Sequence, residues 1–426
     1  MNAIQRRIMH VMSVAAIACC LLFSGRVHAN AAAAAPTGLV QTDAGSGWVY
    51  VSWNLVMQND LTYYYRISDD ASFTVSKTGR ILGGERTSTM IDGLREGSLY
   101  YVQIGTSETY DSKAPADTVW SDTLETATVP DIVDSASIKQ TDAGTTYLTL
   151  TWDAPSGANY YEIKYWRSGE DSDSASTLSS VTNSIQITGL QKDTKYDVRI
   201  YSYRVTSAGY KAGKSKYFYG VKHNINLLPI KVTGVENTSF GPALNRPEFK
   251  WNSVETADGY QYYVYNNSNK KIDSGKTHYS VLTVPSGSMY KKDQFYRIKV
   301  RGYITLADNK VKYGEWSDVL YFAKSPRKNV SAKQSGKNIK VSWNKVTGAT
   351  NYTVYVSDNS LSGYKKVGTV KKTSTTIKKY GKSSLKKGKT YYIKIVANKT
   401  VKIKGKSRTY KSKDTYNYVQ RVTMKR

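Results

Sequence analysis

The sequence predicts an all-β fold made of four consecutive β-sandwich modules. Tyrosine is enriched over phenylalanine, with 36 Tyr against 7 Phe, and aromatic residues favour strands that pack on one face. Four of the eight tryptophans recur at intervals of 99, 99 and 92 residues: Trp53, Trp152, Trp251 and Trp343. Because such an interval is the length of a small domain, the spacing indicates a repeated module.

A strand is expected before each tryptophan. Residues 48–53, 147–152, 247–251 and 339–343 alternate between apolar and polar side chains. This period of two is typical of a strand with one buried face. A further strand is expected at 161–165, 260–264 and 352–356, whereas the three tyrosines at 63–65 leave the register of the first module open.

A second aromatic marker follows each tryptophan after 44 to 48 residues: Tyr100, Tyr196, Tyr296 and Tyr391. A leucine precedes three of these tyrosines by six residues, and Tyr290 takes its place in the third module. Alternating apolar residues after each tyrosine predict another strand. Closing strands are expected at Trp120 and Trp316, at Tyr217 or Tyr219, and at Tyr410, and a proline opens each module: Pro36, Pro130, Pro229 and Pro326.

Each module resembles a fibronectin type III domain on these residues. The resemblance implies a seven-stranded sandwich with a core tryptophan, and it implies that the tyrosine after Leu-x5 forms a tyrosine corner, whose hydroxyl bonds nearby backbone. The expected modules span residues 36–129, 130–227, 228–324 and 325–426. The third and fourth also resemble modules of secreted wall-associated and glycan-associated proteins of Gram-positive bacteria. We expect sparse contacts between modules, so that one could unfold alone.

Residues 1–29 are expected to form a signal peptide. Arg6 and Arg7 precede an apolar stretch that is too short to cross a membrane as a helix. An uncleaved anchor and a lipid on Cys19 are the alternatives. Both cysteines, Cys19 and Cys20, lie in this segment, so the mature chain would have no disulfide. The protein is therefore expected to be secreted and associated with the cell wall, with no transmembrane segment after signal removal.

The sequence gives little support for an enzyme. Beyond the signal segment only His223 and His278 remain, in different modules, so a catalytic triad or a zinc site lacks its residue types. The acids at 69–70 and 170–173 fall in predicted loops, where solvated turns are favoured over weak calcium binding. We predict no catalytic residues, no metal and no cofactor.

The charge changes steeply along the chain. Lys and Arg against Asp and Glu number 6 and 12 in residues 30–130, 11 and 10 in 131–227, 14 and 9 in 228–325, and 27 and 2 in 326–426. A solubilising surface would mix signs, and self-repulsion of this size destabilises a small domain unless counter-charge is near. The last module is therefore predicted to bind a polyanion, with an incidental basic surface as the alternative.

The predicted polyanion-binding residues lie on solvent positions of the expected sandwich. They are Lys378, Lys379, Lys386, Lys387, Lys389, Lys394, Lys402, Lys404, Lys406, Arg408, Lys411 and Lys413. Lys outnumbers Arg in this module by 23 to 4, which favours diffuse attraction over bidentate phosphate recognition. An anionic cell-wall polymer or glycan is the expected partner, rather than a specific nucleic acid.

The predicted function is that of a non-catalytic surface, adhesion or spacer protein with its basic module as a tether. One alternative is a carbohydrate-binding array in which exposed tyrosines stack on sugars; the candidates are the outward-facing members among Tyr63, Tyr64 and Tyr65, Tyr101, Tyr161 or Tyr160, and Tyr392. The other is a scaffold for an unknown protein. The sequence does not identify the ligand, the geometry between modules or the oligomeric state.

Overall fold

The structure is a computed structural model, and it describes residues 33–58, 60–83, 85–213, 223–240, 246–285, 288–290, 293–326, 330–413 and 419–425. The predicted signal peptide, Cys19, and the closing-strand candidates Tyr217 and Tyr219 lie outside these residues, as does the side chain of His223. None of the helices in the described ranges has the length and apolar character needed to span a membrane.

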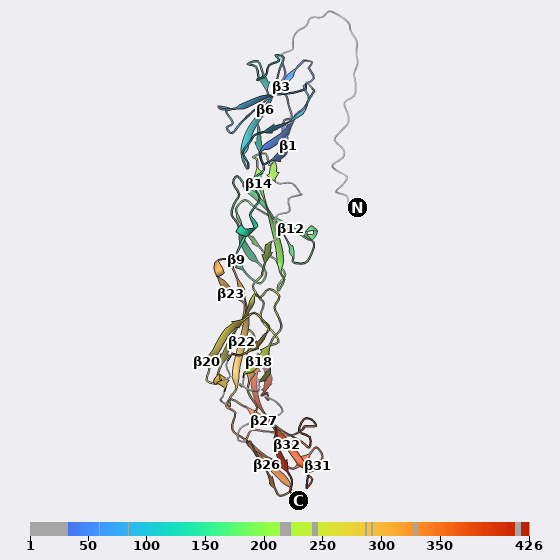
Figure 1. The fold of residues 1–426 in the computed structure, drawn as a ribbon, viewed down its shortest axis with the longest axis vertical. Helices are drawn as coiled ribbons and strands as arrows, with labels where there is room; N and C mark the ends of the chain where they lie inside the picture. Colours follow the sequence, from blue (N-terminus) through green and yellow to red (C-terminus); the bar gives the residue numbers. More distant parts are fainter. Residues whose placement is uncertain are drawn as a thin grey trace, which may run out of the picture. The chain divides into compact units, whose positions relative to one another are not determined.

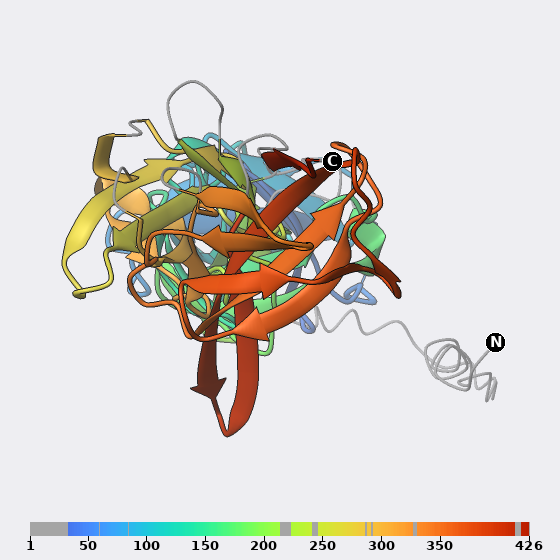
Figure 2. The same cartoon turned by 90° about the horizontal axis from the view of Figure 1, so that it is seen from below.

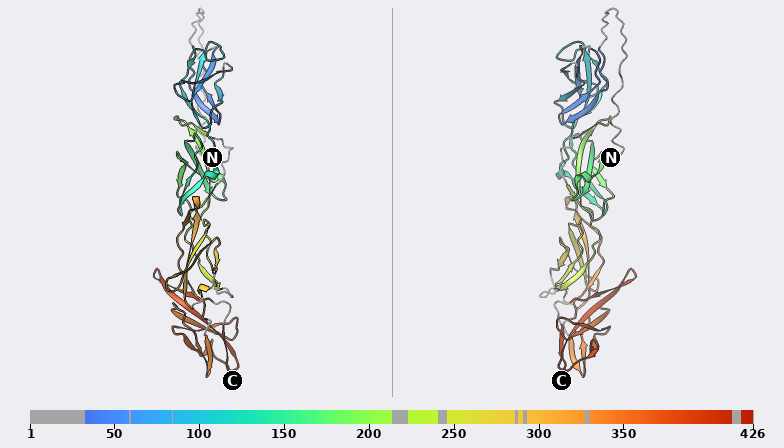
Figure 3. Two further views of the ribbon diagram at one scale, coloured as in Figure 1. Left: turned by 60° about the vertical axis from the view of Figure 1, so that its left-hand side comes forward. Right: turned by 90° about the vertical axis from the view of Figure 1, so that its right-hand side faces the viewer.

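The fold is all-β, as predicted, and the same pair of sheets recurs four times (Figures 1 and 3). Each pair consists of a three-stranded sheet and a five-stranded sheet. The predicted seven strands are present in each module, and the last one is divided into two pieces that both pair with the sixth. The described residues also contain four short 3-10 turns: Ser135–Ser137, Ser172–Ser174, Ser288–Tyr290 and Ala307–Asn309.

The described residues fall into two compact units. The first comprises residues up to Thr42, Tyr50–Thr89 and Tyr100–Leu124, and the second comprises Asp43–Val49, Met90–Leu99 and Glu125–Arg426. The strands of the first module are β1 (Val40–Gly45), β2 (Trp48–Ser52), β3 (Thr62–Ser68), β4 (Lys77–Ile81), β5 (Ser88–Asp92), β6 (Leu99–Ser107), β7 (Val119–Trp120) and β8 (Leu124–Ala127). Their sheets are β1-β2-β5 and β4-β3-β6-β7, with β8 on β6.

The second unit holds the other three modules. The second module has sheets β9-β10-β13 and β12-β11-β14-β15, with β16 on β14. Its strands are β9 (Lys139–Ala143), β10 (Leu148–Thr151), β11 (Tyr160–Arg167), β12 (Ser176–Ser180), β13 (Ser184–Ile187), β14 (Tyr196–Val205), β15 (Lys211–Gly213) and β16 (His223–Ile225).

The third module has sheets β17-β18-β21 and β20-β19-β22-β23, with β24 on β22. Its strands are β17 (Glu236–Phe240), β18 (Pro247–Lys250), β19 (Gly259–Tyr265), β20 (Lys271–Thr277), β21 (Val281–Thr283), β22 (Tyr296–Thr305), β23 (Val311–Tyr313) and β24 (Leu320–Phe322).

The fourth module has sheets β25-β26-β29 and β28-β27-β32-β33, with β34 on β32, and a separate pair β30-β31. Its strands are β25 (Ser331–Ser335), β26 (Asn338–Ser342), β27 (Asn351–Ser357), β28 (Lys365–Val370), β29 (Ser374–Ile377), β30 (Lys379–Tyr380), β31 (Ser383–Ser384), β32 (Thr390–Ile403), β33 (Lys406–Lys411) and β34 (Gln420–Thr423). Figure 2 shows the long hairpin of β32 and β33, in deep red, projecting from the body of this module.

Three connections between strands recur in every module. The B–C connection joins the second strand to the third, the E–F connection joins the fifth to the sixth, and the F–G connection joins the sixth to the seventh. In the fourth module these are the segments between β26 and β27, between β29 and β32, and between β32 and β33.

The predicted core tryptophans are buried in all four modules, with at most 5% of each side chain exposed. Each one packs against a tyrosine of the third strand: the ring centroids of Trp53 and Tyr63, Trp152 and Tyr161, Trp251 and Tyr260, and Trp343 and Tyr352 lie 5.6, 5.2, 5.3 and 5.4 Å apart. Rings at this distance and tilt attract each other beyond the area that they bury. The aromatic pair is thus the repeated centre of each core.

The predicted tyrosine corners are confirmed where their hydrogen bonds are described. The hydroxyl of Tyr196 accepts from the backbone N–H of Gln191 at 3.0 Å, and that of Tyr391 accepts from the N–H of Lys386 at 3.0 Å. In the third module, where leucine is absent, Tyr296 instead donates to the carbonyl of Met289 at 3.4 Å. Each bond fixes the E–F connection against the sixth strand.

In three modules a serine side chain extends the hydrogen-bond ladder between the sixth and the seventh strand. The hydroxyls of Ser121, Ser317 and Ser412 accept from the backbone N–H of Ile104, Val300 and Ala397 at 3.1, 3.0 and 2.9 Å. The N–H of each serine donates to the carbonyl of the same partner. Ser412 is the equivalent of the serine in the two Trp-Ser-Asp markers, although tryptophan is absent there.

Some contacts between modules of the second unit are made by buried side chains. Phe295 and Ala323, which lie in the third module, belong to the buried cluster around Trp343 of the fourth. Ile304 and Leu306, on the F–G side of the third module, belong to the buried cluster of the second. Cores that share side chains should not unfold independently.

The same connections meet at each junction. The E–F connection of one module meets the B–C connection of the next: Gly97 lies so close to Gly157 that a Cβ at Gly157 would collide with the carbonyl of Gly97. Asp193 accepts from the N–H of Thr256 at 3.3 Å. The N–H of Phe295 donates to the carbonyl of Thr347 at 2.9 Å. The junction is therefore a repeated interface.

The strands that follow the F–G connections also contact the preceding module. Ala212 of the second module packs with Ala127 and Val129 of the first. Lys312 of the third module forms an ion pair with Asp142 of the second. The fourth module follows the same pattern, since the hydroxyl of Tyr410 donates to the carbonyl of Val319 in the third module.

Candidate anion-binding surface

The twelve predicted residues occupy both ends of β32. Lys378, Lys379, Lys386, Lys387 and Lys389 lie in the E–F connection, before β32 begins, whereas Lys402, Lys404, Lys406, Arg408, Lys411 and Lys413 lie on or beside the F–G hairpin. All eleven are exposed, and Lys394 in the middle of β32 is half-buried. A strand of 14 residues is about 45 Å long, so the two groups do not form one site.

The E–F connection of the fourth module, residues 378–389, forms an ordered surface that we name the E–F platform. Fourteen residues separate Ile377, where β29 ends, from Tyr391, against nine from Ile187 to Tyr196 in the second module. The added length forms the β30-β31 hairpin, in which Lys379 lies opposite Ser384. No predicted element covered this hairpin.

Tyr380 anchors the hairpin to the module. Its ring lies 6.1 Å from that of Tyr391 in an edge-on arrangement, and its hydroxyl donates to the carbonyl of Gly363 at 3.1 Å. The ammonium of Lys365 lies 4.6 Å from the centre of the same ring, a distance at which cation and ring attract. The lysines beside it therefore stand on an ordered segment.

The turn at Lys386–Lys389 is fixed by its backbone. Gly388 has a φ of 78°, a region that glycine adopts without strain. Its N–H donates to the carbonyl of Met424 at 2.8 Å, and the N–H of Met424 donates to the carbonyl of Lys389 at 2.9 Å. Together with the Tyr391 corner, these bonds hold the backbone while the three lysine side chains stay exposed.

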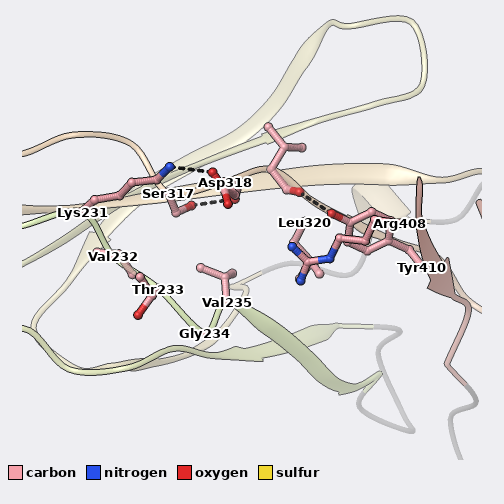
Figure 4. Close-up of a pocket in the computed structure, with 11 residues that line it drawn as sticks. Lys231, Val232, Thr233, Gly234, Val235, Ser317, Asp318, Leu320, Arg408 and Tyr410 are labelled. Atoms are coloured by element: carbon pink, nitrogen blue, oxygen red, sulfur yellow. Dashed lines mark hydrogen bonds and ion pairs between the residues drawn. The ribbon is translucent and has the colours of Figure 1, made fainter. Parts of the chain in front are cut away.

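The F–G hairpin, in contrast, contacts the third module. The hydroxyl of Tyr410, which is 6% exposed, donates to the carbonyl of Val319 at 3.1 Å (Figure 4). The rings of Tyr410 and Tyr321 lie 5.3 Å apart. The N–H of Lys413 donates to the carbonyl of Ala323 at 2.9 Å. Tyr410 and Lys413 thus lie at the junction with the third module, and polyanion binding by the six basic residues of this hairpin stays a prediction.

A carboxylate of the third module also lies near the basic residues of the F–G hairpin. Lys231 donates to Asp318 at 2.6 Å (Figure 4), and this hydrogen bond and charge lower the pKa of the Asp318 carboxyl, with Lys404 and Arg408 adding to the shift. Two adjoining pockets of about 210 and 460 Å³ lie beside these residues, and Arg408 and Tyr410 line both. Lys404 and Arg408 thus have a counter-charge within the protein.

The predicted glycan-stacking tyrosines are mostly covered. Tyr63, Tyr64 and Tyr161 are buried, whereas Tyr65, Tyr101, Tyr160 and Tyr392 are half-buried. Tyr64 is buried because its hydroxyl bonds the backbone of Thr109 and Asp111 in the F–G connection that folds over it. The carboxylates in the predicted loops bond to nearby backbone; for example, the Asp171 carboxylate accepts a hydrogen bond from the N–H of Asp173.

Comparison with known proteins supports the fold. Residues 135–219 match the family model described as the fibronectin type III domain. A solved structure of chicken CNTN1 FN1-FN3 domains is similar to 67% of this chain over 97% of its own length, with 16% identity and a TM-score of 0.28. The second module is thus similar in sequence to the fibronectin type III domain, the other three repeat its pair of sheets, and an array of such modules fits a non-catalytic adhesion or spacer protein.

Proposed function

We propose that the protein is an exported spacer whose fourth module tethers it to an anionic polymer of the cell wall. The observation that carries the proposal is the E–F platform of that module. It places five exposed lysines, Lys378, Lys379, Lys386, Lys387 and Lys389, on a backbone that is held by hydrogen bonds and by the packed ring of Tyr380. An ordered basic surface without acidic neighbours in sequence attracts a polyanion.

The rest of the module adds to the attraction. Lys333 on β25 lies directly opposite Lys340 on β26, and both are exposed. Like charges in this position repel each other across a sheet, and a bound polyanion would relieve the repulsion. Only two acids, Asp358 and Asp414, accompany the 27 basic residues of this segment.

The chemistry of the surface favours a repeating anion. Lysine is a hydrated point charge without the fixed fork of arginine, so many weak contacts along a phosphate-bearing or carboxylate-bearing polymer suit it better than one tight pocket. Such binding depends on salt, because the screening length falls from about 30 Å at 0.01 M to about 8 Å at 0.15 M.

The test uses point variants in place of deletion of the module, since deletion would uncover Phe295 and Ala323. The platform variant carries Lys386→Glu, Lys387→Glu and Lys389→Glu. The matched control carries the same charge change at Lys366, Lys371 and Lys372, which are also exposed. Retention of each full-length protein on isolated Gram-positive cell walls is measured across a salt series.

The platform variant is expected to lose retention at a much lower salt concentration than the control. Equal retention of the two variants would show that the platform is not the tether. Retention of the wild type that is independent of salt would refute an electrostatic tether altogether.

Export is part of the proposal. The signal-like segment at residues 1–29 supports it. Sequencing the N-terminus of the protein recovered from the cell surface is expected to show that this segment has been removed. Recovery of the protein only from the cytoplasm would contradict the assignment.

A further inference from the structure

The first module presents, in exposed form, the two connections that the other modules bury at a junction. Its B–C connection holds Leu55 and Met57, which are 41% and 90% exposed, and its F–G connection holds Tyr110, which is 72% exposed. Gln58 donates to Glu108 at 2.9 Å and joins the two connections. Exposed apolar residues gathered in this way mark interaction surfaces.

The backbone N–H groups of Val56, Val254 and Val346 each donate to the hydroxyl of the third-strand tyrosine and so align the B–C connections. At the positions of Leu55 and Met57 the third and fourth modules carry polar or charged residues, which are Ser253, Glu255, Lys345 and Thr347. Leu306 and Tyr410, in or beside the F–G connections of the third and fourth modules, are each 6% exposed. In their B–C connections, Thr256 and Val346 are at most 1% exposed. Exposed apolar side chains at these two B–C positions therefore distinguish the first module from the third and fourth.

The charges at this end are opposite to those at the E–F platform of the fourth module. The two connections of the first module contain Asp60, Glu108, Asp111 and Asp117 against Lys113. Residues 378–389 contain six lysines and no acid. At the junctions within the chain the E–F connections carry both signs, as Lys192, Asp193 and Lys195 of the second module show. Charge complementarity of this kind selects partners and suppresses wrong ones.

We propose that a second copy of this chain is the partner: the B–C and F–G connections of the first module in one copy dock on the E–F platform of the fourth module in another. The contact repeats the E–F to B–C meeting seen at all three internal junctions. Because it joins two different surfaces, it would generate rings or open chains of molecules rather than two-fold dimers.

Charge-swap variants of the full-length protein test this inference by sedimentation velocity. The head variant carries Met57→Lys and Glu108→Lys, and the tail variant is the platform variant, Lys386→Glu, Lys387→Glu and Lys389→Glu. Both change exposed side chains only. The wild type is expected to associate at low salt and to dissociate near 1 M salt, where the screening length is about 3 Å.

Each variant alone is expected to associate at least about tenfold more weakly than the wild type, since like charges then meet at the contact. An equimolar mixture of head and tail variants is expected to recover association, because each reversed end meets a reversed partner. A wild type that stays monomeric at low salt, or a mixture that associates no better than its components, would overturn the inference.

The inference shares the E–F platform with the proposed tether, and the head variant separates the two. Glu108 and Met57 lie outside the fourth module, so the head variant is expected to keep its retention on cell walls while losing self-association. If the wild type is monomeric but the tail variant loses wall retention, self-association fails and the tether stands. If the head variant loses wall retention equally, retention depends on assembly and the platform is not an independent tether.

Discussion

Phe295 offers the sharpest test of whether the third and fourth modules share a core. Its side chain is 1% exposed and lies in the cluster of Trp343 and Tyr391, although by sequence it belongs to the third module. Replacing a buried phenylalanine by alanine removes about 3–5 kcal/mol of stability. Since small domains are stable by about 5–15 kcal/mol, this loss is large for the fourth module.

Hydrogen exchange followed by mass spectrometry locates the loss. With Phe295→Ala, amides of β26 and β27 in the fourth module are expected to exchange at least about 100-fold faster, because each 1.4 kcal/mol changes the open population about tenfold. The control is Phe249→Ala, which removes a side chain from the third module's own cluster and is expected to accelerate exchange chiefly in β18 and β19. If Phe295→Ala speeds exchange only in the third module, the shared core is refuted.

Three further predictions concern single groups. Tyr391→Phe removes the acceptor for the N–H of Lys386 and is expected to destabilise the fourth module by about 1 kcal/mol, as seen in its urea midpoint. Ser412→Ala leaves a buried backbone N–H without its acceptor and is expected to cost about 1–3 kcal/mol in the same measurement; no change would show that the hydroxyl is not needed in the ladder. Burial raises the pKa of Asp273, whose carboxylate accepts a hydrogen bond from the Tyr290 hydroxyl at 2.9 Å. The native state therefore holds the proton more tightly than the unfolded state, and wild-type stability falls as pH rises from the carboxyl's ordinary pKa to its raised one. Asp273→Asn is expected to be more stable than the wild type at neutral pH but not below that range, and a lower thermal midpoint of the variant at neutral pH would contradict the assignment.

The repeated core could be predicted because its signal is periodic. Trp343 and Tyr391 recur at fixed spacing within alternating runs, and the structure buries both. The register at residues 63–65 could not be predicted, because three consecutive tyrosines fit either face. The structure buries two neighbours, Tyr63 and Tyr64, since the F–G connection covers the outer face of the strand.

The junctions could not be predicted from alternation. A period of two identifies a buried face but not the module that covers it, so Phe295 and Ile304 are indistinguishable from residues of their own core. Nor does alternation show that Arg408 and Asp318 line the same pocket, and polyanion binding by Arg408 stays a prediction. The one usable signal for the E–F platform was the greater length between Ile377 and Tyr391.

The central claim is that an anionic wall polymer holds the protein through the E–F platform. The most direct measurement compares retention of the wild type on isolated cell walls before and after chemical removal of their anionic polymers, at low salt. Retention is expected to fall on the stripped walls to the level of the Lys386→Glu, Lys387→Glu and Lys389→Glu variant on intact walls. Undiminished retention on stripped walls would contradict the claim.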